Sequence, residues 1–354
     1  MNSGACWRMH TARVGSADID TIILGAGIAG LFAARTLSDA GRRIVVFDKG
    51  RGVGGRMATR RVGDCVADHG AQYFTARDPQ FRTWVERWLK EGLVNLWSDG
   101  FATSSGRLNQ NGEPRYIGSR GMTSLPKSLA VGLDVTLNAT AVACRWVGGW
   151  WEVAFKETED GTEPVRARSL VLTTPVPQSL ALLKTGNVTL EAEVQAALER
   201  IEYSRCLAAL IQLEGASRVP PPGGLWLDGE PVGWVADNQQ KGVSPKDAGA
   251  CVTIHAGPRF SLAHWEDEPD STARKLVDAV QGWLGSPVKS AQLHRWRFAT
   301  PVVTHPARCL TQKGSGPMVF AGDAFAGPRV EGAALSGLAA GEAILSMKRP
   351  GAID

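Results

Sequence analysis

The sequence predicts an α/β fold: a parallel-sheet domain that is discontinuous along the chain, with an α+β domain inserted into it. A buried strand at residues 20–24 is followed by a glycine-rich turn, an apolar helix up to Ala40 and a second strand at residues 43–47, and this order forms a βαβ unit. The middle of the chain is richer in strand patterns. A short buried strand at residues 318–321 and an apolar helix at residues 332–347 follow, so the outer segments complete one domain around the insert.

The expected domain division follows from this order, and a length of 354 residues fits two domains. The expected segments of the outer domain are residues 19–78, 121–178 and 308–350. The expected segments of the inserted domain are residues 79–120 and 179–307. We expect residues 1–18 to be a flexible N-terminal extension, because they carry Arg8 and Arg13 but no apolar stretch.

Periodicity predicts the remaining elements. Helical spacing of apolar residues predicts helices at residues 81–93, 121–133, 177–184, 190–200 and 270–284. Alternating or short apolar runs predict strands at residues 134–137, 165–173, 205–213, 225–236, 251–256 and 291–298, and a hairpin at residues 144–155 that turns at Gly148-Gly149.

The composition excludes several classes of protein. The formal net charge is +4 and no block of like charge stands out, so nothing demands a nucleic acid or a membrane as partner. The longest apolar runs fall well short of the ~18 residues that span a bilayer. The six cysteines are scattered without a C-x-x-C pair, and no His/Cys cluster has metal-ligand spacing. We therefore expect a soluble cytoplasmic protein without a metal, and its oligomeric state stays open.

The first motif is Gly25-x-Gly27-x-x-Gly30, between the first strand and the first helix. Gly25 permits the tight turn, Gly27 lets a diphosphate approach the backbone, and Gly30 lets the helix pack on the strand. The helix N-terminus supplies free N–H groups and a positive dipole end for the phosphates. Asp48, at the end of the second strand, can accept hydrogen bonds from a ribose. This unit predicts a site for the ADP part of a dinucleotide.

Two further motifs narrow the cofactor to FAD. Residues 51–57, Arg-Gly-Val-Gly-Gly-Arg-Met, resemble the extended fingerprint of flavoproteins in the amine-oxidase superfamily, in which this stretch runs along the cofactor diphosphate. The strand ending at Gly322-Asp323 and the helix that begins near Gly332 resemble the C-terminal flavin motif of the same superfamily. The helix N-terminus would face the flavin N1–C2=O edge, where a positive dipole end stabilises the reduced flavin.

Taken together, residues 48–57, the run Gly70-Ala71-Gln72-Tyr73-Phe74-Thr75 and residues 322–333 resemble the renalase family, particularly its bacterial members. The resemblance implies a Rossmann-like FAD-binding domain with an inserted substrate domain, as in amine oxidases and p-hydroxybenzoate hydroxylase. It also implies noncovalent FAD and a hydride taken from 2- or 6-dihydroNAD(P), with O2 as acceptor and H2O2 as product. Residues 322–328 depart from the bacterial renalase pattern in their middle.

The motifs and the resemblance yield two sets of site residues. The expected cofactor-binding residues are Gly25, Gly27, Ile28, Ala29, Gly30, Asp48, Lys49, Gly55, Arg56, Met57, Ala71, Gln72, Val142, Gly322, Asp323, Glu331, Gly332 and Ala333. The expected residues of the substrate pocket are Gln72, Tyr73, His255 and Trp296. Hydride transfer to a flavin needs no base from the protein, so these side chains are expected to position the substrate. Tyr73 and His255 are equally compatible with core positions.

Two other functions stay open at this point. One is an oxidase or desaturase that acts on an amine or another small molecule. Many amine oxidases carry a lysine in a substrate-domain strand, and the matching strand that begins near Arg205 has none, which argues against this alternative. The other is a flavin- or dinucleotide-binding protein without catalysis.

Overall fold

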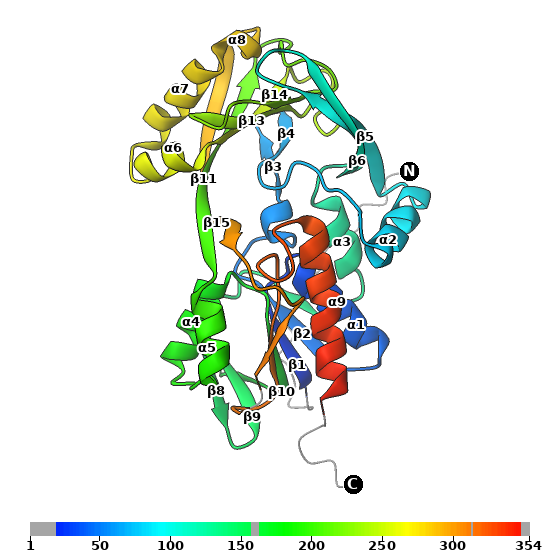
Figure 1. Cartoon of the computed structure of the whole chain (residues 1–354), viewed down its shortest axis with the longest axis vertical. Helices are drawn as coiled ribbons and strands as arrows, with labels where there is room; N and C mark the ends of the chain where they lie inside the picture. The colour runs from blue at the N-terminus through cyan, green and yellow to red at the C-terminus, as the bar shows by residue number, and fades with distance from the viewer. Residues whose placement is uncertain (1–18, 157–162, 313, 348–354) are drawn as a thin grey trace.

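Two β-sheets lie one above the other along the long axis of the molecule, and strands run between them (Figure 1). The computed structural model describes residues 19–156, 163–312 and 314–347. No helix within these ranges is both long and apolar enough to cross a bilayer.

The first sheet has eight strands and is parallel at its centre. Its strands are β1 (Ile19–Leu24), β2 (Ile44–Phe47), β7 (Val135–Thr136), β8 (Ala141–Val147), β9 (Trp150–Phe155), β10 (Val165–Leu172), β16 (Leu310–Gln312) and β17 (Met318–Phe320). β1 pairs in parallel with β2 and β10, β2 with β7, and β10 with β17. The central strands are therefore buried on both faces, which explains their continuous apolar runs.

Helices cover both faces of this sheet. The helices on one face are α1 (Ile28–Asp39) and α9 (Val330–Ser346), flanked by α3 (Ser124–Ala130) and α2 (Pro79–Lys90). On the other face lie α4 (Val176–Thr185) and α5 (Ala192–Glu199). Gly337 brings α9 close to α1, because a Cβ there would lie 2.1 Å from the Ala29 carbonyl oxygen.

The second sheet has seven strands, in the order β15-β11-β14-β13-β12-β5-β6. These are β5 (Val94–Ala102), β6 (Leu108–Gly118), β11 (Glu202–Leu213), β12 (Gly224–Trp226), β13 (Val232–Asp237), β14 (Cys251–Ala256) and β15 (Val288–Val303). The helices α6 (Pro258–Ala263), α7 (Pro269–Ala279) and α8 (Gln281–Leu284) accompany this sheet.

Alternation along β11 gives this sheet two distinct faces. Leu207, Ala209 and Ile211 share a buried cluster with residues of α7 and α8. Leu210 points to the other face, where the hairpin of β3 (Thr59–Val62) and β4 (Cys65–Asp68) covers it. The hairpin does not cover the lower part of that second face, where the site described below lies.

Several elements differ from the sequence-based expectation. The predicted strand at 225–236 is an antiparallel pair, β12 and β13, because Gly229 at φ +95° and Pro231, which has no N–H, interrupt it. The helix expected from residue 121 begins at Ser124. Strands β3, β4, β5 and β6 were not predicted. Most of α4 and all of α5 fall within the expected inserted domain, but they pack against the first sheet, since Leu183, Val194 and Leu198 belong to its core.

Candidate cofactor and substrate site

The turn after β1 shows why two of its glycines are needed. Gly25 has φ +109°, and a Cβ there would lie 2.5 Å from Thr173 Oγ1. At Gly30 a Cβ would lie 1.9 Å from the Gly25 carbonyl oxygen. A side chain at Gly25 would therefore clash with Thr173, and one at Gly30 would force α1 away from the strand that it follows.

Gly27 differs, because no described atom lies within 4 Å of its Cβ position. The second glycine loop runs directly beside it: Gly54 N–H donates to the Ala26 carbonyl at 2.8 Å, and Gly27 and Gly54 form a β-bridge. Gly55 has φ +53°, and its Cβ position is 3.7 Å from Gly27 Cα. Glycines of the two loops thus meet at the N-terminus of α1, where Ile28 and Ala29 present main-chain N–H groups. This cradle fits a diphosphate.

Asp48 organises the adjoining loop. Its Oδ2 accepts the Ala26 N–H at 2.7 Å and its Oδ1 accepts the Gly50 N–H at 2.6 Å. The segment after β7 runs alongside, because Ala139 N–H donates to the Asp48 carbonyl at 2.9 Å. Val142 is 41% exposed at a bulge in β8, and Lys49 Nζ lies 3.4 Å from Gln178 Oε1. These residues stand where the first βαβ unit would receive a nucleoside.

Arg56 connects the two sheets. It forms a bidentate ion pair with Asp323, with both N–O distances 2.7 Å, and also donates to the carbonyls of Phe298 and Ala299 in β15. Burial raises the pKa of Asp323, and Arg56 opposes that rise. The neighbouring Met57 is buried. The Asp323 carboxylate is therefore held by Arg56.

The N-terminus of α9 is fixed through a side chain. Glu331 is buried, and its Oε1 accepts the N–H groups of Arg77 and Asp78 at 2.6 and 2.7 Å. Its carboxylate thus supports a loop. Gly332 lies in the first turn of α9, whereas the Ala333 N–H already donates to the Arg329 carbonyl at 2.9 Å. The divergent segment 322–328 pairs with His305, because Ala326, at φ +61°, donates its N–H to the His305 carbonyl.

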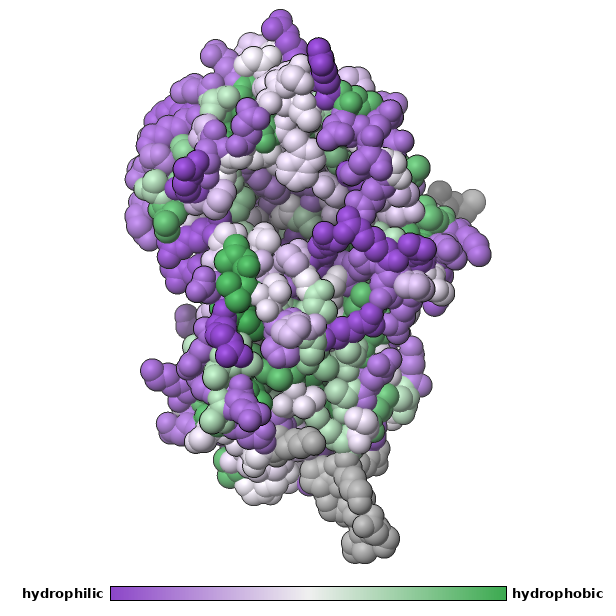
Figure 2. All heavy atoms as spheres, viewed as in Figure 1, coloured by the Kyte–Doolittle hydropathy of each residue, from purple (hydrophilic) through white to green (hydrophobic). Residues whose placement is uncertain are grey.

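The open face of the second sheet carries a row of side chains in cross-strand register. Ala208 of β11 pairs with His294 on one side and with His255 on the other, and His255 pairs with Trp234. The small Ala208 side chain leaves space between the two imidazoles. The surface is hollowed between the upper and lower parts of the molecule, with hydrophilic residues along the rim (Figure 2).

Two of the predicted pocket residues converge on one carbonyl. Trp296 Nε1 donates to the His69 carbonyl at 2.8 Å, and His255 Nε2 lies 3.2 Å from the same oxygen. The His69 ring stacks on Trp296 at 5.2 Å and meets His294 edge-on at 4.8 Å. His69 was not predicted, although it precedes the Gly70–Thr75 run that drew attention to this segment.

All three imidazoles are neutral at pH 7. Burial lowers the pKa of His69 to about 3, with further lowering by His294 and Arg60. Burial also lowers the pKa of His255 to about 4 and that of His294 to about 4. These side chains can orient a ligand, but they are weak bases at neutral pH.

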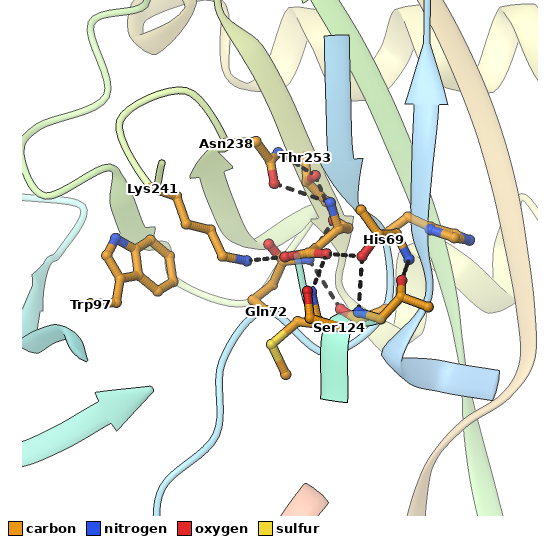
Figure 3. A network of polar contacts seen from close by, with 12 residues as sticks. His69, Gln72, Trp97, Ser124, Asn238, Lys241 and Thr253 are labelled. Atoms are coloured by element: carbon orange, nitrogen blue, oxygen red, sulfur yellow. Dashed lines mark hydrogen bonds and ion pairs between the residues drawn. The ribbon is translucent and has the colours of Figure 1, made fainter. Parts of the chain in front are cut away.

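Behind this segment lies a buried ion pair between Asp68 and Lys241 (Figure 3). Lys241 Nζ is 2.7 Å from Asp68 Oδ2, and both side chains are fully buried. Asp68 Oδ1 accepts the Thr59 hydroxyl and the Met122 N–H. Lys241 also lies 5.0 Å from the Trp97 ring centroid. Burial lowers the pKa of Lys241, and Asp68 opposes that effect.

The same network fixes Gln72. Its Nε2 donates to the carbonyls of Asp68 and Gly70 at 2.7 and 3.1 Å, and Thr253 of β14 donates to the Asp68 carbonyl at 2.8 Å (Figure 3). Gln72 Oε1 is buried without a partner among the described residues. The Ala71 N–H donates to the Arg56 carbonyl at 2.8 Å. The run after His69 is thus held between the glycine loop and the second sheet.

Tyr73 lies in a cluster of aromatic rings. Its ring centroid is 5.3 Å from that of Phe101, 5.9 Å from that of Trp234 and 6.2 Å from that of Trp97. Burial raises the pKa of its hydroxyl. Because Trp234 pairs with His255, this cluster adjoins the row of side chains on the sheet. The hairpin, the glycine loop and the second sheet therefore meet at one region. Around this region lie Tyr73, Gln72, His255 and Trp296.

Two protein-family models match this chain. A family model described as "NAD(P)-binding Rossmann-like domain" matches residues 23–88, and one described as "Flavin containing amine oxidoreductase" matches residues 95–345, which is most of the chain. The chain belongs to the flavin containing amine oxidoreductase family. FAD is therefore its cofactor. The glycine cradle fits that cofactor.

Solved structures share the fold of this flavoprotein. Cyclohexylamine oxidase from Brevibacterium oxydans is 14% identical with a TM-score of 0.69, covering 93% of this chain and 99% of that one. A putrescine oxidase with bound putrescine is 16% identical with a TM-score of 0.65, covering 94% of this chain and 100% of that one. The predicted fold class is confirmed.

Curated relatives of the flavoprotein match over shorter stretches. Putrescine oxidase of Kocuria rosea is 29% identical over 126 residues, which are 33% of this chain and 26% of that protein. A Mycobacterium tuberculosis sequence named as a flavin-containing monoamine oxidase, AofH, is 44% identical over 55 residues, 16% of this chain and 12% of its own length. The matches thus span about an eighth to a quarter of these relatives.

Proposed function

We propose that this flavoprotein oxidises dihydronicotinamide isomers, 2- or 6-dihydroNAD(P), to NAD(P)⁺. The bound FAD would supply the two-electron acceptor for a hydride from the dihydropyridine carbon, and O2 with a proton would then take the electron pair to give H2O2. The family membership supports the flavin chemistry, and the choice of substrate rests on the residues around the site.

One observation carries the proposal: among the described residues, the side chains around the site offer no ready proton acceptor. The three imidazoles have pKa values lowered to about 3–4. Among the described carboxylates nearby, Asp68 is paired with Lys241 and Asp323 with Arg56. An ammonium substrate must lose a proton before its C–H can leave as hydride, whereas a dihydropyridine needs only correct placement.

The pocket residues have separable proposed roles. Tyr73 offers a ring face for a planar heterocycle. Trp296 and His255 fix the His69 carbonyl and thereby the segment that carries Gln72. Gln72 Oε1 is available to accept an N–H from the substrate or the cofactor. Together these contacts would hold the ring in place and keep water away from it.

Amine oxidation is the second candidate, because putrescine oxidase and cyclohexylamine oxidase share the fold. The strand near Arg205 has no lysine, and Arg205 itself lies over the Trp265 ring at 4.9 Å. A buried lysine does occur nearby, but Lys241 comes from the segment after β13 and is paired with Asp68.

Anaerobic stopped-flow mixing distinguishes the two candidates. We expect 2- or 6-dihydroNAD(P) to bleach the flavin within seconds, and putrescine, cyclohexylamine and benzylamine to do so far more slowly. Admission of O2 should then restore the yellow form with about one H2O2 per substrate, because a reduced flavin carries two electrons. Fast bleaching by an amine, with inert dihydronicotinamides, would refute the proposal.

We also propose that FAD is held without a covalent bond, as the resemblance to renalases implies. Acid precipitation should release all of the yellow colour into the supernatant. Colour retained in the protein pellet would show a covalent link instead.

A further inference from the structure

Arg115 of β6 is a buried guanidinium beside the pocket. The residue is 7% exposed, and its Cζ lies 5.1 Å from the Phe101 ring centroid and 5.7 Å from that of Tyr73. Tyr73 was assigned to the pocket above, so this cation borders the same aromatic cluster.

Among the described residues no carboxylate forms an ion pair with the guanidinium, although the Glu113 carboxylate is close enough to interact with it electrostatically. The guanidinium donates at 2.9 Å to the main-chain carbonyl of Glu113 and at 3.1 Å to Asn111 Oδ1. The Glu113 carboxylate turns instead to Arg77, with which it forms a two-point ion pair. Burial of a cation without an ion-pair partner is unfavourable, so a counter-charge from a ligand would be favourable here.

Unsatisfied donors gather around this cation. Arg115 Nε and Trp234 Nε1 are both buried without an acceptor among the described residues. The Trp234 ring is 4.9 Å from that of Phe101, so both N–H groups border the same rings. Arg115 and the exposed Arg329 add positive potential at Tyr73, and the Glu113 carboxylate partly opposes them. A surplus of N–H donors with a net positive charge is suited to an anion.

We propose that Arg115 and the Trp234 indole bind an anionic group of the substrate, a phosphate or a carboxylate, beside a ring that packs on Tyr73. The assignment of this group to the substrate rests on the proposed function, since a dihydronicotinamide nucleotide carries phosphate. A site of this kind would exclude polyamines, because two like charges would share one buried pocket.

Binding to the oxidised FAD-loaded protein tests this without turnover. The probes are matched pairs: benzoate against benzamide for a carboxylate, phenyl phosphate against phenol for a phosphate, and nicotinamide mononucleotide against nicotinamide riboside. Affinity is followed by calorimetry and by the change in the flavin spectrum. We expect the anionic member of at least one pair to bind tenfold or more tightly than its partner without the anionic group.

Substitution of Arg115 tests whether this residue causes the preference for the anion. Arg115→Gln should lose the preference for the anionic group while it keeps the affinity for benzamide and phenol, and Arg115→Lys should retain part of the preference. Arg107→Gln is the matched control, because Arg107 is exposed on the same β5–β6 hairpin. If Arg115→Gln fails to fold, the wild-type pairs and Arg115→Lys still decide the question.

The outcomes separate this inference from the proposed function. Equal affinity for both members of every pair in the wild type, or an unchanged preference in a folded Arg115→Gln protein, would overturn the inference. A preference that depends on Arg115 in a protein that leaves dihydronicotinamides unoxidised would refute the proposed function alone.

Discussion

Gly27 faces the open space between the two glycine loops, and this makes it a sharp probe of the cofactor site. No described atom lies within 4 Å of its Cβ position, so Gly27→Val should fold normally. The isopropyl group would occupy the cradle that we assign to the diphosphate. We expect the purified variant to retain less than a tenth of the FAD of the wild type, measured as the absorbance ratio of flavin to protein.

Gly282→Val is the matched control for that variant. Gly282 also has no described atom within 4 Å of its Cβ position, but it lies in α8, beside the second sheet. It should keep full FAD. A folded Gly27→Val protein with wild-type FAD content would mean that the diphosphate binds elsewhere.

Trp296 and His255 meet at the His69 carbonyl, so their substitution should affect the substrate more than the cofactor. Trp296→Phe removes one N–H donor and His255→Ala removes a ring, and both should keep FAD. We expect each to slow anaerobic flavin reduction by the substrate 10- to 100-fold, equivalent to about 1–3 kcal/mol of transition-state binding. Trp150→Phe in β9 should react like the wild type. Unchanged rates of flavin reduction in both pocket variants would show that Trp296 and His255 do not belong to the substrate site.

The role of a single residue could be predicted from the sequence where neighbouring residues determine it, and not where a distant partner does. The roles of Gly25 and Gly30 follow from a turn of six residues, and their Cβ contacts explain the motif. Lys241 gave no signal, because its partner Asp68 lies 173 positions away and the surrounding sequence reads as a polar loop. The row formed by His294, Ala208 and His255 likewise requires the strand register.

The β3–β4 hairpin is held at its end by the Asp68–Lys241 pair, and removal of one charge should loosen it. Lys241→Met leaves the Asp68 carboxylate buried without its counter-charge, so we expect a loss of about 3–5 kcal/mol in the free energy of unfolding. The double variant Lys241→Met/Asp68→Asn should recover part of that loss. Urea denaturation measures both. A Lys241→Met protein as stable as the wild type would show that the pair contributes little.

Strands were harder to predict where successive residues do not alternate between polar and apolar. Residues 108–112 of β6 are all exposed, and their sequence, Leu-Asn-Gln-Asn-Gly, carries no apolar stripe. Strands β3 and β4 have only four residues each, which is too short for a period to appear. By contrast, β8 and β9 were predicted as a hairpin because Gly148 and Gly149 mark the turn, and both have positive φ.

The stability of the whole protein should fall below pH 6.5, because three histidines are neutral in the folded state. The pKa of His69 falls from 6.5 to about 3, and those of His255 and His294 fall to about 4. Between these values and 6.5 the unfolded chain binds more protons, so stability is complete above pH 6.5 and is lost as the pH falls. For the buried His69 the slope is about 1.4 kcal/mol per pH unit.

Urea midpoints at pH 7.5, 6.0 and 5.0, with saturating FAD, measure this effect. His69→Gln should flatten the decline between pH 6 and 5. A midpoint that does not change over this range would show that the histidines titrate alike in both states.

The position of β17 has a consequence for synthesis on the ribosome. β17 pairs with β10, which pairs with β1, so strands from distant parts of the chain are neighbours in one sheet. Gly322, Asp323 and the start of α9 follow β17 directly. The nascent polypeptide can therefore form the Gly25–Gly30 turn early, but it cannot enclose FAD until α9 has left the exit tunnel and packed on α1. Cofactor capture thus awaits the synthesis of α9, and a ribosome stalled before residue 318 should carry a nascent chain that does not retain flavin.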